Sequence, residues 1–362
     1  MHLSRSANRS GAGPEANNMK WISHALLLVV IAAIPGVPCS AATVVIKSGN
    51  VVGSPVNGAM AHHIQQTQQD FARLVAIETN GEVDLRILEG KRADIPVFNM
   101  PAMTADGSII QACAVPSFFL PRVSAFKIFE IPYLFRDKAH AAKYPDSELA
   151  RLFSSRIEDA YDVKVLAHFL VAHNVSITST DKPMVLPEDF SGRYINDDFE
   201  SFAPMWMNVK PAKRYSIGFT AAAAGALHAD AQLDTSIGML QNNVAQKQYT
   251  KFHYATIAPG FYTFFYTFII NTGVWNNLTE TQRAGVQRAA HATQNLAVVN
   301  EEATAIHHIA LNEALGVNIH MQTADERDAW RTEFSDKVRD GILNRSDNAD
   351  ELRAYIEMIE AL

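Results

Sequence analysis

The segment from Thr279 to Leu315 has the pattern of a single, unusually long amphipathic helix. Thr279 is placed to cap it, and its apolar side chains recur every three or four positions, at Val286, Ala289, Ala292, Leu296, Val299, Ala303, Ile306 and Ala310. An α-helix rises about 1.5 Å per residue, so a helix of this length spans more than one ordinary domain width. We therefore expect it to tie two lobes together.

Strand-like and helix-like segments alternate over the rest of the chain. The expected elements are a strand in Thr43–Gly49, a helix from about Ala59 to Glu78, and then a strand in Asn80–Leu88, a buried strand in Lys164–Val171, a strand in Gly192–Asn196, an alanine-rich helix in Ala221–Ala229 and an aromatic strand in Phe261–Asn271. This alternation predicts an α/β sheet with helices on its faces. Because no linker separates two lobes, several chain crossings must join them. We expect the first lobe in residues 43–171 and about 262–305, and the second in residues 172–261 and about 306–362.

Residues 1–42 do not fit this pattern and are predicted to be a signal peptide with an N-terminal extension. Met19 and Lys20 precede the apolar run Ala25–Ile34, which is followed by proline, glycine and small residues. The run is shorter than the ~20 residues that a membrane-spanning helix needs. Cleavage after Ala41 or Ala42 would release a periplasmic protein. The extension is interpreted as a mis-assigned start or as a naturally longer signal.

Composition favours a globular chain and excludes some partners. Hydrophobic residues make up 48% of the sequence and charged residues 19%. Removing residues 1–42 removes three of the 31 basic residues and one of the 38 acidic residues, which leaves a net charge of −9. Such a charge argues against nucleic acid and anionic membranes as partners. Cys113 is the single cysteine left after cleavage, so no intramolecular disulfide is possible.

Motifs for catalysis are missing from the sequence. It contains no G-x-S-x-G elbow, no H-E-x-x-H segment and no P-loop, and the glycines between Gly49 and Gly58 lack the dinucleotide-binding spacing. The pair His307 and His308 cannot readily share a metal, because adjacent helical side chains point about 100° apart. We therefore expect no enzyme activity, no cofactor and no metal.

Several polar and aromatic residues are candidates for a ligand site. His62 and His63 lie near the start of the first helix, and His173 and Asn174 end the buried strand, so all of them fit a crevice at strand ends. Tyr254, Phe261 and Tyr262 lie at the entrance of the aromatic strand and could wall a ligand. The alternative for these aromatic residues and for the histidines is ordinary core or surface packing.

Three segments together resemble the DctP-like substrate-binding proteins of tripartite ATP-independent periplasmic (TRAP) transporters. EIPYLFRDKAHAAKY (Glu130–Tyr144) resembles a signature that leads into a helix with histidine, ITSTDKPMVLPEDFSGRYI (Ile177–Ile195) resembles the run into a central strand, and FIINTGVWNNLTETQRAGVQRAA (Phe268–Ala290) resembles the element that opens the long helix. In order and spacing, the resemblance covers most of the chain from about Val45 to Leu315. It implies a two-lobe α/β periplasmic binding protein fold, with a ligand cleft between lobes joined by strands and a long helix.

The resemblance also reveals a departure at Asn196. In the family, the strand that GRYIN resembles usually ends in an arginine that binds the ligand carboxylate through two parallel hydrogen bonds, and Asn196 occupies this position. Arg193 lies three residues earlier and points to the other face of a strand. Val175 or Ser176 stands where many relatives carry a second basic residue. We therefore predict that Asn196 lies in the ligand site.

Other positions near these strands are further candidates. Tyr215 and Thr220 bound a strand that the resemblance retains, and Asp234 and Thr235 precede another. Asp234 and Thr235 could instead cap a helix, and residues 197–198 are interpreted as a solvated strand end. The ligand either lacks the usual carboxylate or has its acid held elsewhere, for instance by a histidine of the first helix or by backbone amides.

These observations predict a solute-binding protein that closes its lobes around a small organic ligand and delivers the ligand to the membrane permease of a TRAP system. We expect it to be a monomer. A ligand sensor that docks on a signalling receptor is an alternative that the sequence does not separate from transport. A two-lobe periplasmic enzyme is the third possibility, and the missing catalytic motifs count against it.

Overall fold

The computed structural model describes residues 43–49, 61–88, 99–114, 116–197, 213–215 and 231–362, and within them one mixed sheet of nine strands. The strands are β1 (Val44–Gly49), β2 (Val83–Ile87), β3 (Gln111–Ala114), β4 (Val163–Ser179), β5 (Tyr194–Asp197), β6 (Lys213–Tyr215), β7 (Thr235–Gly238), β8 (Tyr254–Asn271) and β9 (Asn318–Met321). The predicted signal peptide and the predicted alanine-rich helix lie outside the described residues.

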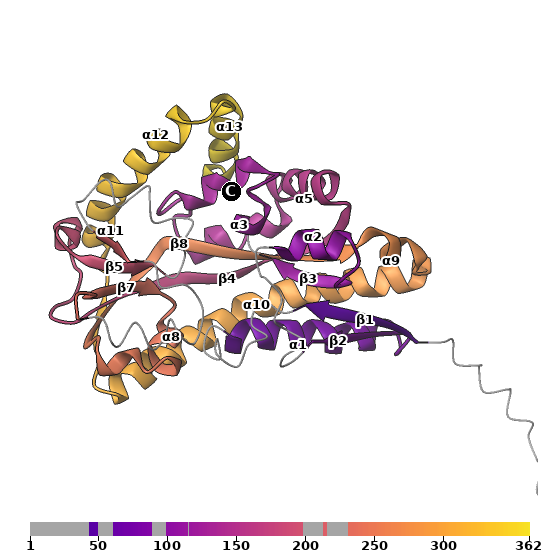
Figure 1. Cartoon of the computed structure of the whole chain (residues 1–362), viewed down its shortest axis with the longest axis horizontal. Helices are drawn as coiled ribbons and strands as arrows, with labels where there is room; N and C mark the ends of the chain where they lie inside the picture. Colours follow the sequence, from indigo (N-terminus) through magenta and orange to yellow (C-terminus); the bar gives the residue numbers. More distant parts are fainter. Residues whose placement is uncertain (1–42, 50–60, 89–98, 115, 198–212, 216–230) are drawn as a thin grey trace, which may run out of the picture. The chain divides into compact units, whose positions relative to one another are not determined.

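Helices cover the sheet, as the α/β pattern predicts. The α-helices are α1 (Ala61–Glu78), α2 (Met100–Ala105), α3 (Pro116–Phe119), α4 (Lys138–Ala141), α5 (Glu148–Tyr161), α8 (Leu240–Ala245), α9 (Thr272–Asn277), α10 (Glu280–Ala314), α11 (Ala324–Trp330), α12 (Asp336–Asn344) and α13 (Ala349–Glu360). The shorter 3-10 and π segments are η4 (Ser124–Glu130), η5 (Tyr144–Asp146), η6 (Pro187–Phe190), η7 (Gln248–Thr250) and η8 (Arg331–Ser335). Figure 1 shows α1, α8 and α10 on one side of the long strands and α3, α5, α12 and α13 on the other.

The two long strands β4 and β8 hold the two halves of the sheet together. They pair antiparallel from Val163–Asn271 at one end to Ser179–Tyr254 at the other, with register shifts on both sides of Ala172. β3 joins β8 at residues 267–270, whereas β7 joins β4 at residues 176–179. The remaining strands therefore attach at opposite ends of one shared ladder. Because both halves share this ladder, residues 41–362 form a single compact unit.

Helix α10 confirms the predicted long helix and its cap. Thr279 Oγ1 accepts a hydrogen bond from Gln282 N at 3.2 Å, and Gln282 Oε1 accepts one from Thr279 N at 3.0 Å, which is a capping box. The helix runs beside β4 (Figure 1), and Gln287 Nε2 donates to the carbonyl oxygen of Leu166 at 2.6 Å. α10 therefore follows the shared ladder from one half toward the other.

The apolar stripe predicted along α10 is only partly buried. Val286 and Ala289 are at most 1% exposed, but Val299 and Ile306 are 63% and 64% exposed. The stripe repeats about every 3.5 residues, whereas an α-helix turns every 3.6, so a straight helix rotates such a stripe by about 20° per heptad away from its starting direction. The C-terminal part of the stripe consequently faces solvent.

A glycine allows α1 and α10 to pack closely. A Cβ atom on Gly285 would lie 2.6 Å from the carbonyl oxygen of Glu78 and 2.8 Å from Thr79 Cγ2. Helix propensity alone predicts that Gly285→Ala stabilises the protein by about 1 kcal/mol. We expect the opposite, a loss of about 2 kcal/mol in the free energy of unfolding, because the helices must move apart. Urea unfolding checks the sign, and the exposed neighbouring residue in Ala284→Gly gives the propensity effect alone.

The predicted lobe boundaries stay a prediction. The C-terminal helix α13 contacts α5 and η4, and Arg156 of α5 forms an ion pair with Glu351 of α13. The end of the chain therefore lies against elements expected in the first lobe. Among the described residues, no helix combines the length and the apolar character needed to cross a membrane.

Candidate functional site

Asn196 lies near the end of β5 and is buried between neighbouring parallel strands. It is 3% exposed, and its Nδ2 donates a hydrogen bond to Ser236 Oγ of β7 at 3.3 Å. In the sheet it lies between Tyr215 of β6 and Ser236 of β7. An uncharged amide therefore occupies the place where an arginine was expected, at the carboxyl ends of parallel strands, where α/β proteins commonly bind ligands.

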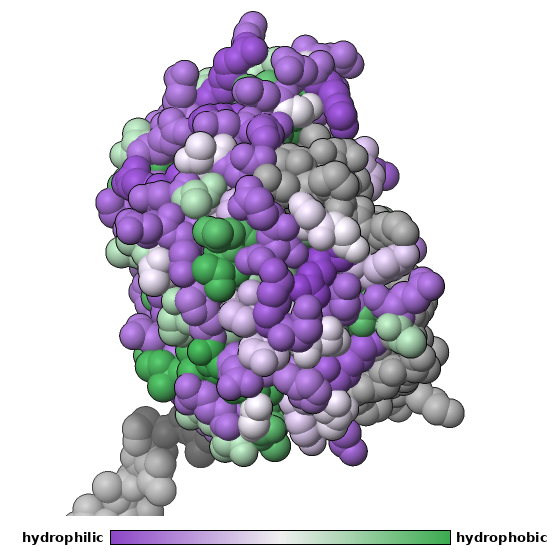
Figure 2. Space-filling view, turned by 90° about the vertical axis from the view of Figure 1, so that its left-hand side faces the viewer, coloured by the Kyte–Doolittle hydropathy of each residue, from purple (hydrophilic) through white to green (hydrophobic). Residues whose placement is uncertain are grey.

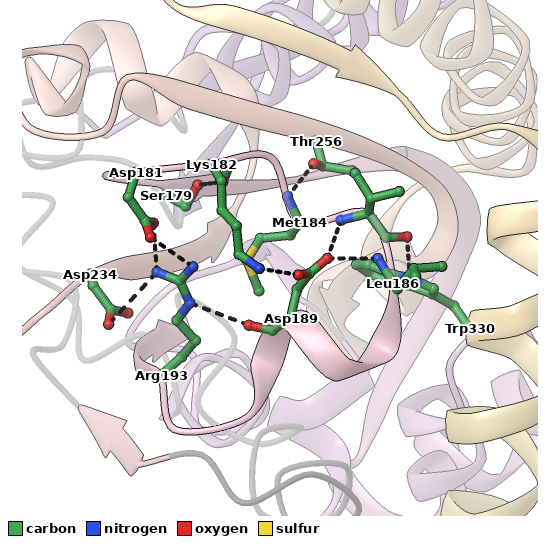
Figure 3. Close-up of polar contacts among 11 residues, drawn as sticks. Ser179, Asp181, Lys182, Met184, Leu186, Asp189, Arg193, Asp234, Thr256 and Trp330 are labelled. Atoms are coloured by element: carbon green, nitrogen blue, oxygen red, sulfur yellow. Dashed lines mark hydrogen bonds and ion pairs between the residues drawn. The ribbon is translucent and has the colours of Figure 1, made fainter.

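The nearby Arg193 is fully engaged in a structural network, drawn in Figure 3. Its Nη1 and Nη2 donate to the two carboxylate oxygens of Asp181 at 2.7 and 3.2 Å, and its Nε donates to the carbonyl oxygen of Asp189 at 3.2 Å. The hydrogen bonds from Arg193 hold the pKa of Asp181 below its ordinary value. Arg193 therefore anchors the segment that leads into β5, and it does not replace the missing arginine.

Asp234 and Thr235 lie at a strand junction. Asp234 Oδ1 accepts hydrogen bonds from Tyr194 N at 3.2 Å and from Thr235 Oγ1 at 2.9 Å, and Thr235 is fully buried. The Asp234 carboxylate also lies 3.8 Å from Arg193. These contacts join the start of β5 to the start of β7, so the two residues support the sheet instead of capping a helix.

His173 is buried where β4 passes from one half of the sheet to the other. Its Nδ1 lies 3.0 Å from Thr263 Oγ1 of β8. Burial lowers the pKa of His173 to about 4, so the imidazole is neutral at neutral pH. The ring also packs against Gly260, which has φ of +80°, and a Cβ there would lie 3.3 Å from His173 Cε1. His173 therefore packs between β8 and Gly260, and its place in the ligand site stays a prediction.

Asn174, the next residue, meets a buried carboxylate from α10. Glu301 Oε1 accepts hydrogen bonds from Asn174 Nδ2 and from His173 N, each at 3.4 Å. Lys138 Nζ of α4 lies 2.7 Å from Glu301 Oε2, and the Glu301 side chain is only 5% exposed. This contact satisfies backbone and side-chain donors at the irregular part of β4, next to its register shifts.

A small cavity lies beside this contact, where β4 passes α10 and the start of α8. Its volume is about 30 Å³. The polar residues that line it are Asn174, Gln241, Glu301, Thr304 and His308. The apolar residues that line it are Val171, Ala172, Met239, Leu240, Ile257, Ala305 and Ile309. We call it the crossing pocket. Asn174 is the one predicted site residue in its lining.

Sequence analysis could have placed Glu301 and His308 on the buried face of α10, but the apolar stripe suggested a different face. The buried face of α10 continues from Val286 through Ala297 to Glu301 and Asn312, at the 3.6-residue repeat of a straight helix. His308 lies on the same face. If the buried face that starts at Val286 is continued with a repeat of 3.6 residues instead of 3.5, Glu301 and His308 both lie on the inward-facing side of the helix.

The aromatic candidates belong mainly to the core. Phe261 and Tyr262 are at most 1% exposed, and the Phe261 ring centroid lies 5.5 Å from that of Trp330 and 5.6 Å from that of Tyr133. Tyr254 is half-buried at the first position of β8. Phe261 and Tyr262 therefore have core contacts, and their role as walls of a ligand site stays a prediction.

The remaining candidates are only partly covered by the structure. His62 and His63 lie in the first turn of α1, and Tyr215 ends β6, but their side chains are outside the described part; Thr220 lies outside it altogether. In the portion of the chain that is described, no three histidine, cysteine or acidic side chains are arranged to hold a metal ion.

Comparison with known proteins identifies the family. Residues 56–343 match the sequence profile of the bacterial extracellular solute-binding proteins, family 7. The chain belongs to this family. Family 7 consists of substrate-binding proteins, so membership agrees with the missing catalytic motifs, and the predicted TRAP relationship is confirmed.

The similarity to a curated relative covers most of the chain. The chain is 23% identical over 315 residues to the C4-dicarboxylate-binding periplasmic protein DctP of Rhodobacter capsulatus, covering 85% of this chain and 89% of that protein.

Solved structures confirm the predicted two-lobe α/β fold. A TRAP periplasmic solute-binding protein from Ralstonia eutropha H16 with bound (S)-2-acetolactate is similar with a TM-score of 0.70 at 21% identity, over 88% of this chain and 99% of that one. A TRAP periplasmic solute-binding protein from Chromohalobacter salexigens with bound D-glucuronate is similar with a TM-score of 0.73 at 16% identity, over 87% of this chain and 99% of that one.

Proposed function

We propose that the protein is the periplasmic solute-binding subunit of a TRAP transporter, exported by the signal peptide in residues 1–42. It captures a small organic ligand by lobe closure and delivers it to the membrane permease. Membership of family 7 carries this proposal. The shared β4–β8 ladder and α10 support it, because they connect two halves that can close on a ligand without covalent chemistry.

The ligand of this protein either lacks the carboxylate found in the ligands of its relatives, or has a carboxylate that the protein binds at a place other than β5. The named relatives bind a C4-dicarboxylate, acetolactate and glucuronate. In this chain Asn196 is an uncharged buried amide, Arg193 is bound to Asp181, and Val175 is fully buried. Desolvating a carboxylate without a charged partner is costly. An acidic ligand would therefore need another partner for its charge, for instance His62, His63 or backbone amides.

The exposed apolar residues support a monomer. Figure 2 shows one face on which hydrophobic residues form separate small patches among hydrophilic ones. Stable association usually requires a larger contiguous apolar surface. We expect size-exclusion chromatography with light scattering to give the mass of a single chain.

A thermal-shift screen followed by titration calorimetry tests the ligand class. Across organic acids, sugars, amino-acid derivatives and aromatic compounds, the true ligand raises the melting temperature because it binds the folded form. We expect Asn196→Ala to weaken that ligand about 10-fold, since a buried hydrogen bond to the ligand is lost. The exposed residue in Asn344→Ala serves as the matched control and should leave the affinity unchanged.

Two results would count against the proposal in different ways. Tight binding of succinate that is lost in Asn196→Ala would place a ligand carboxylate at β5, which would contradict the proposed ligand class but keep the transport function. Turnover of a bound compound by the purified protein would contradict the transport function itself.

A further inference from the structure

The crossing pocket is small. Its volume of about 30 Å³ is enough to hold a water-sized chemical group. Thr304, Ala305 and His308 on its α10 side are half-buried, so the pocket is open to solvent along the helix. A terminal hydroxyl or amide of a ligand fits this volume.

The negative charge of Glu301 in the pocket is neutralised by Lys138, which lies outside the pocket lining. Among the described residues that line it there is no lysine or arginine, and the carboxylate they contribute, Glu301, is 5% exposed. Lys138 does not line the pocket, but its ammonium lies 2.7 Å from Glu301 Oε2 and 3.4 Å from Glu302 Oε2. The negative charge of Glu301 is therefore compensated by a cation that a ligand does not meet.

This arrangement disfavours charged groups of either sign. A ligand carboxylate in the pocket would face Glu301 with no lysine or arginine among the described lining residues, and like charges at short range repel, the more so beside a carboxylate as buried as Glu301. A ligand ammonium would compete with Lys138 for a carboxylate that is already paired. An uncharged group can donate to the Glu301 oxygen and exchange hydrogen bonds with the neighbouring amides of Asn174 and Gln241.

We propose that Glu301, held by Lys138, sets the charge selectivity of the crossing pocket, which admits an uncharged hydroxyl or amide and rejects a carboxylate. The proposal rests on the proposed function in taking this pocket as part of the ligand site. It identifies the ligand as one with an uncharged hydrogen-bonding end, and Glu301 as a specificity-determining residue. It also gives Glu301 a role beyond its support of the β4 backbone.

The test uses two probes of nearly the same shape, formamide and sodium formate, on the full mature chain. Binding is followed through the side-chain amide NMR signals of Asn174 and Gln241, at one fixed pH for all proteins and probes. In the wild type, we expect formamide to shift these signals and formate to bind about 10-fold more weakly or not at all.

Variants at neighbouring positions separate the pocket charge from the helix charge. Glu301→Gln keeps an oxygen that can accept from the β4 backbone, but it leaves Lys138 without its nearer carboxylate. We expect formate to gain at least about 10-fold in affinity in this variant, because the carboxylate that repels it is gone and the nearby charge of Lys138 is no longer neutralised by Glu301. Glu302→Gln is the matched control: it removes the same charge next to Lys138, from a side chain 68% exposed and outside the pocket. It should behave as the wild type does.

Every outcome is informative. Equal binding of formate and formamide by the wild type, no gain of formate binding in Glu301→Gln, or no response to formamide would overturn the proposal. If Glu301→Gln does not fold, Lys138→Met gives the reciprocal test, since an unpaired Glu301 should then bind methylammonium. If the probes behave as expected but no compound raises the melting temperature, the pocket assignment stands and the proposed function fails.

Discussion

Replacing Trp330 by alanine is expected to lower the free energy of unfolding by about 4 kcal/mol. Trp330 ends α11 and is fully buried, and its ring centroid lies 5.2 Å from that of Phe190 and 5.5 Å from that of Phe261. Its Nε1 donates to the carbonyl oxygen of Val185 at 2.8 Å, at the edge of the network in Figure 3. Alanine leaves a cavity among these rings and removes the donor, so both packing and a hydrogen bond are lost.

Two further variants separate the contribution of packing from that of the hydrogen bond and provide a control. Trp330→Phe keeps one ring of the packing and removes the donor and part of the indole, so a loss of about 2 kcal/mol, smaller than for alanine, is expected. Trp275→Ala, on the half-buried tryptophan of α9, is the control and should cost clearly less than Trp330→Ala. Urea unfolding of the three variants measures the differences. Equal losses for alanine at both positions would contradict the assignment of Trp330 to the core.

Replacing Glu130 by glutamine is expected to make the protein more stable at high pH. Glu130 ends η4 and is 8% exposed, and burial raises the pKa of its carboxyl from 4.5 to about 8. Between these two values the unfolded chain loses the proton while the folded protein keeps it. The stability contributed by Glu130 is therefore fully present below 4.5 and is lost as the pH rises to 8, by on the order of 4 kcal/mol.

Urea unfolding at a pH below 4.5 and at a pH above 8 measures this effect as the difference between the wild type and Glu130→Gln. The gap should be small in acid and should favour the variant in base, because glutamine has no charge to bury. Glu357→Gln, on the exposed face of α13, controls for the loss of one surface carboxylate. If Glu130→Gln were less stable than the wild type by the same amount at both pH values, the Glu130 carboxyl would stabilise the fold independently of its charge, and the prediction would be wrong.

Local patterns predicted the elements of the fold better than their exact extents. The cap at Thr279 and the length of α10 followed from residues close together in the chain. The extent of β4 did not, because the polar residues after Val171 suggested a strand end, whereas pairing with β7 and β8 carries the strand to Ser179. Partner strands far away in sequence supply hydrogen bonds that a local pattern cannot reveal.

The candidate site was predictable only in part for the same reason. The missing arginine at Asn196 could be recognised from the resemblance, but its partner Ser236 lies on another strand. Glu301 belongs to a helix face that could be read at a 3.6-residue repeat, yet its ion pair with Lys138 joins distant segments. The sequence therefore predicted which residues are candidates for the site. Which of them line a pocket depends on contacts between distant segments, which the sequence does not show.

The order of strands around β8 has a consequence for how the chain is made. β3 and β4 gain their shared neighbour only when residues 254–271 have been synthesised, and Gln111 then pairs with Ile270 across much of the sequence. Contacts between such distant residues slow folding, because large loops must close first. We therefore expect this chain to fold more slowly than a protein of similar length whose paired strands are neighbours in the sequence.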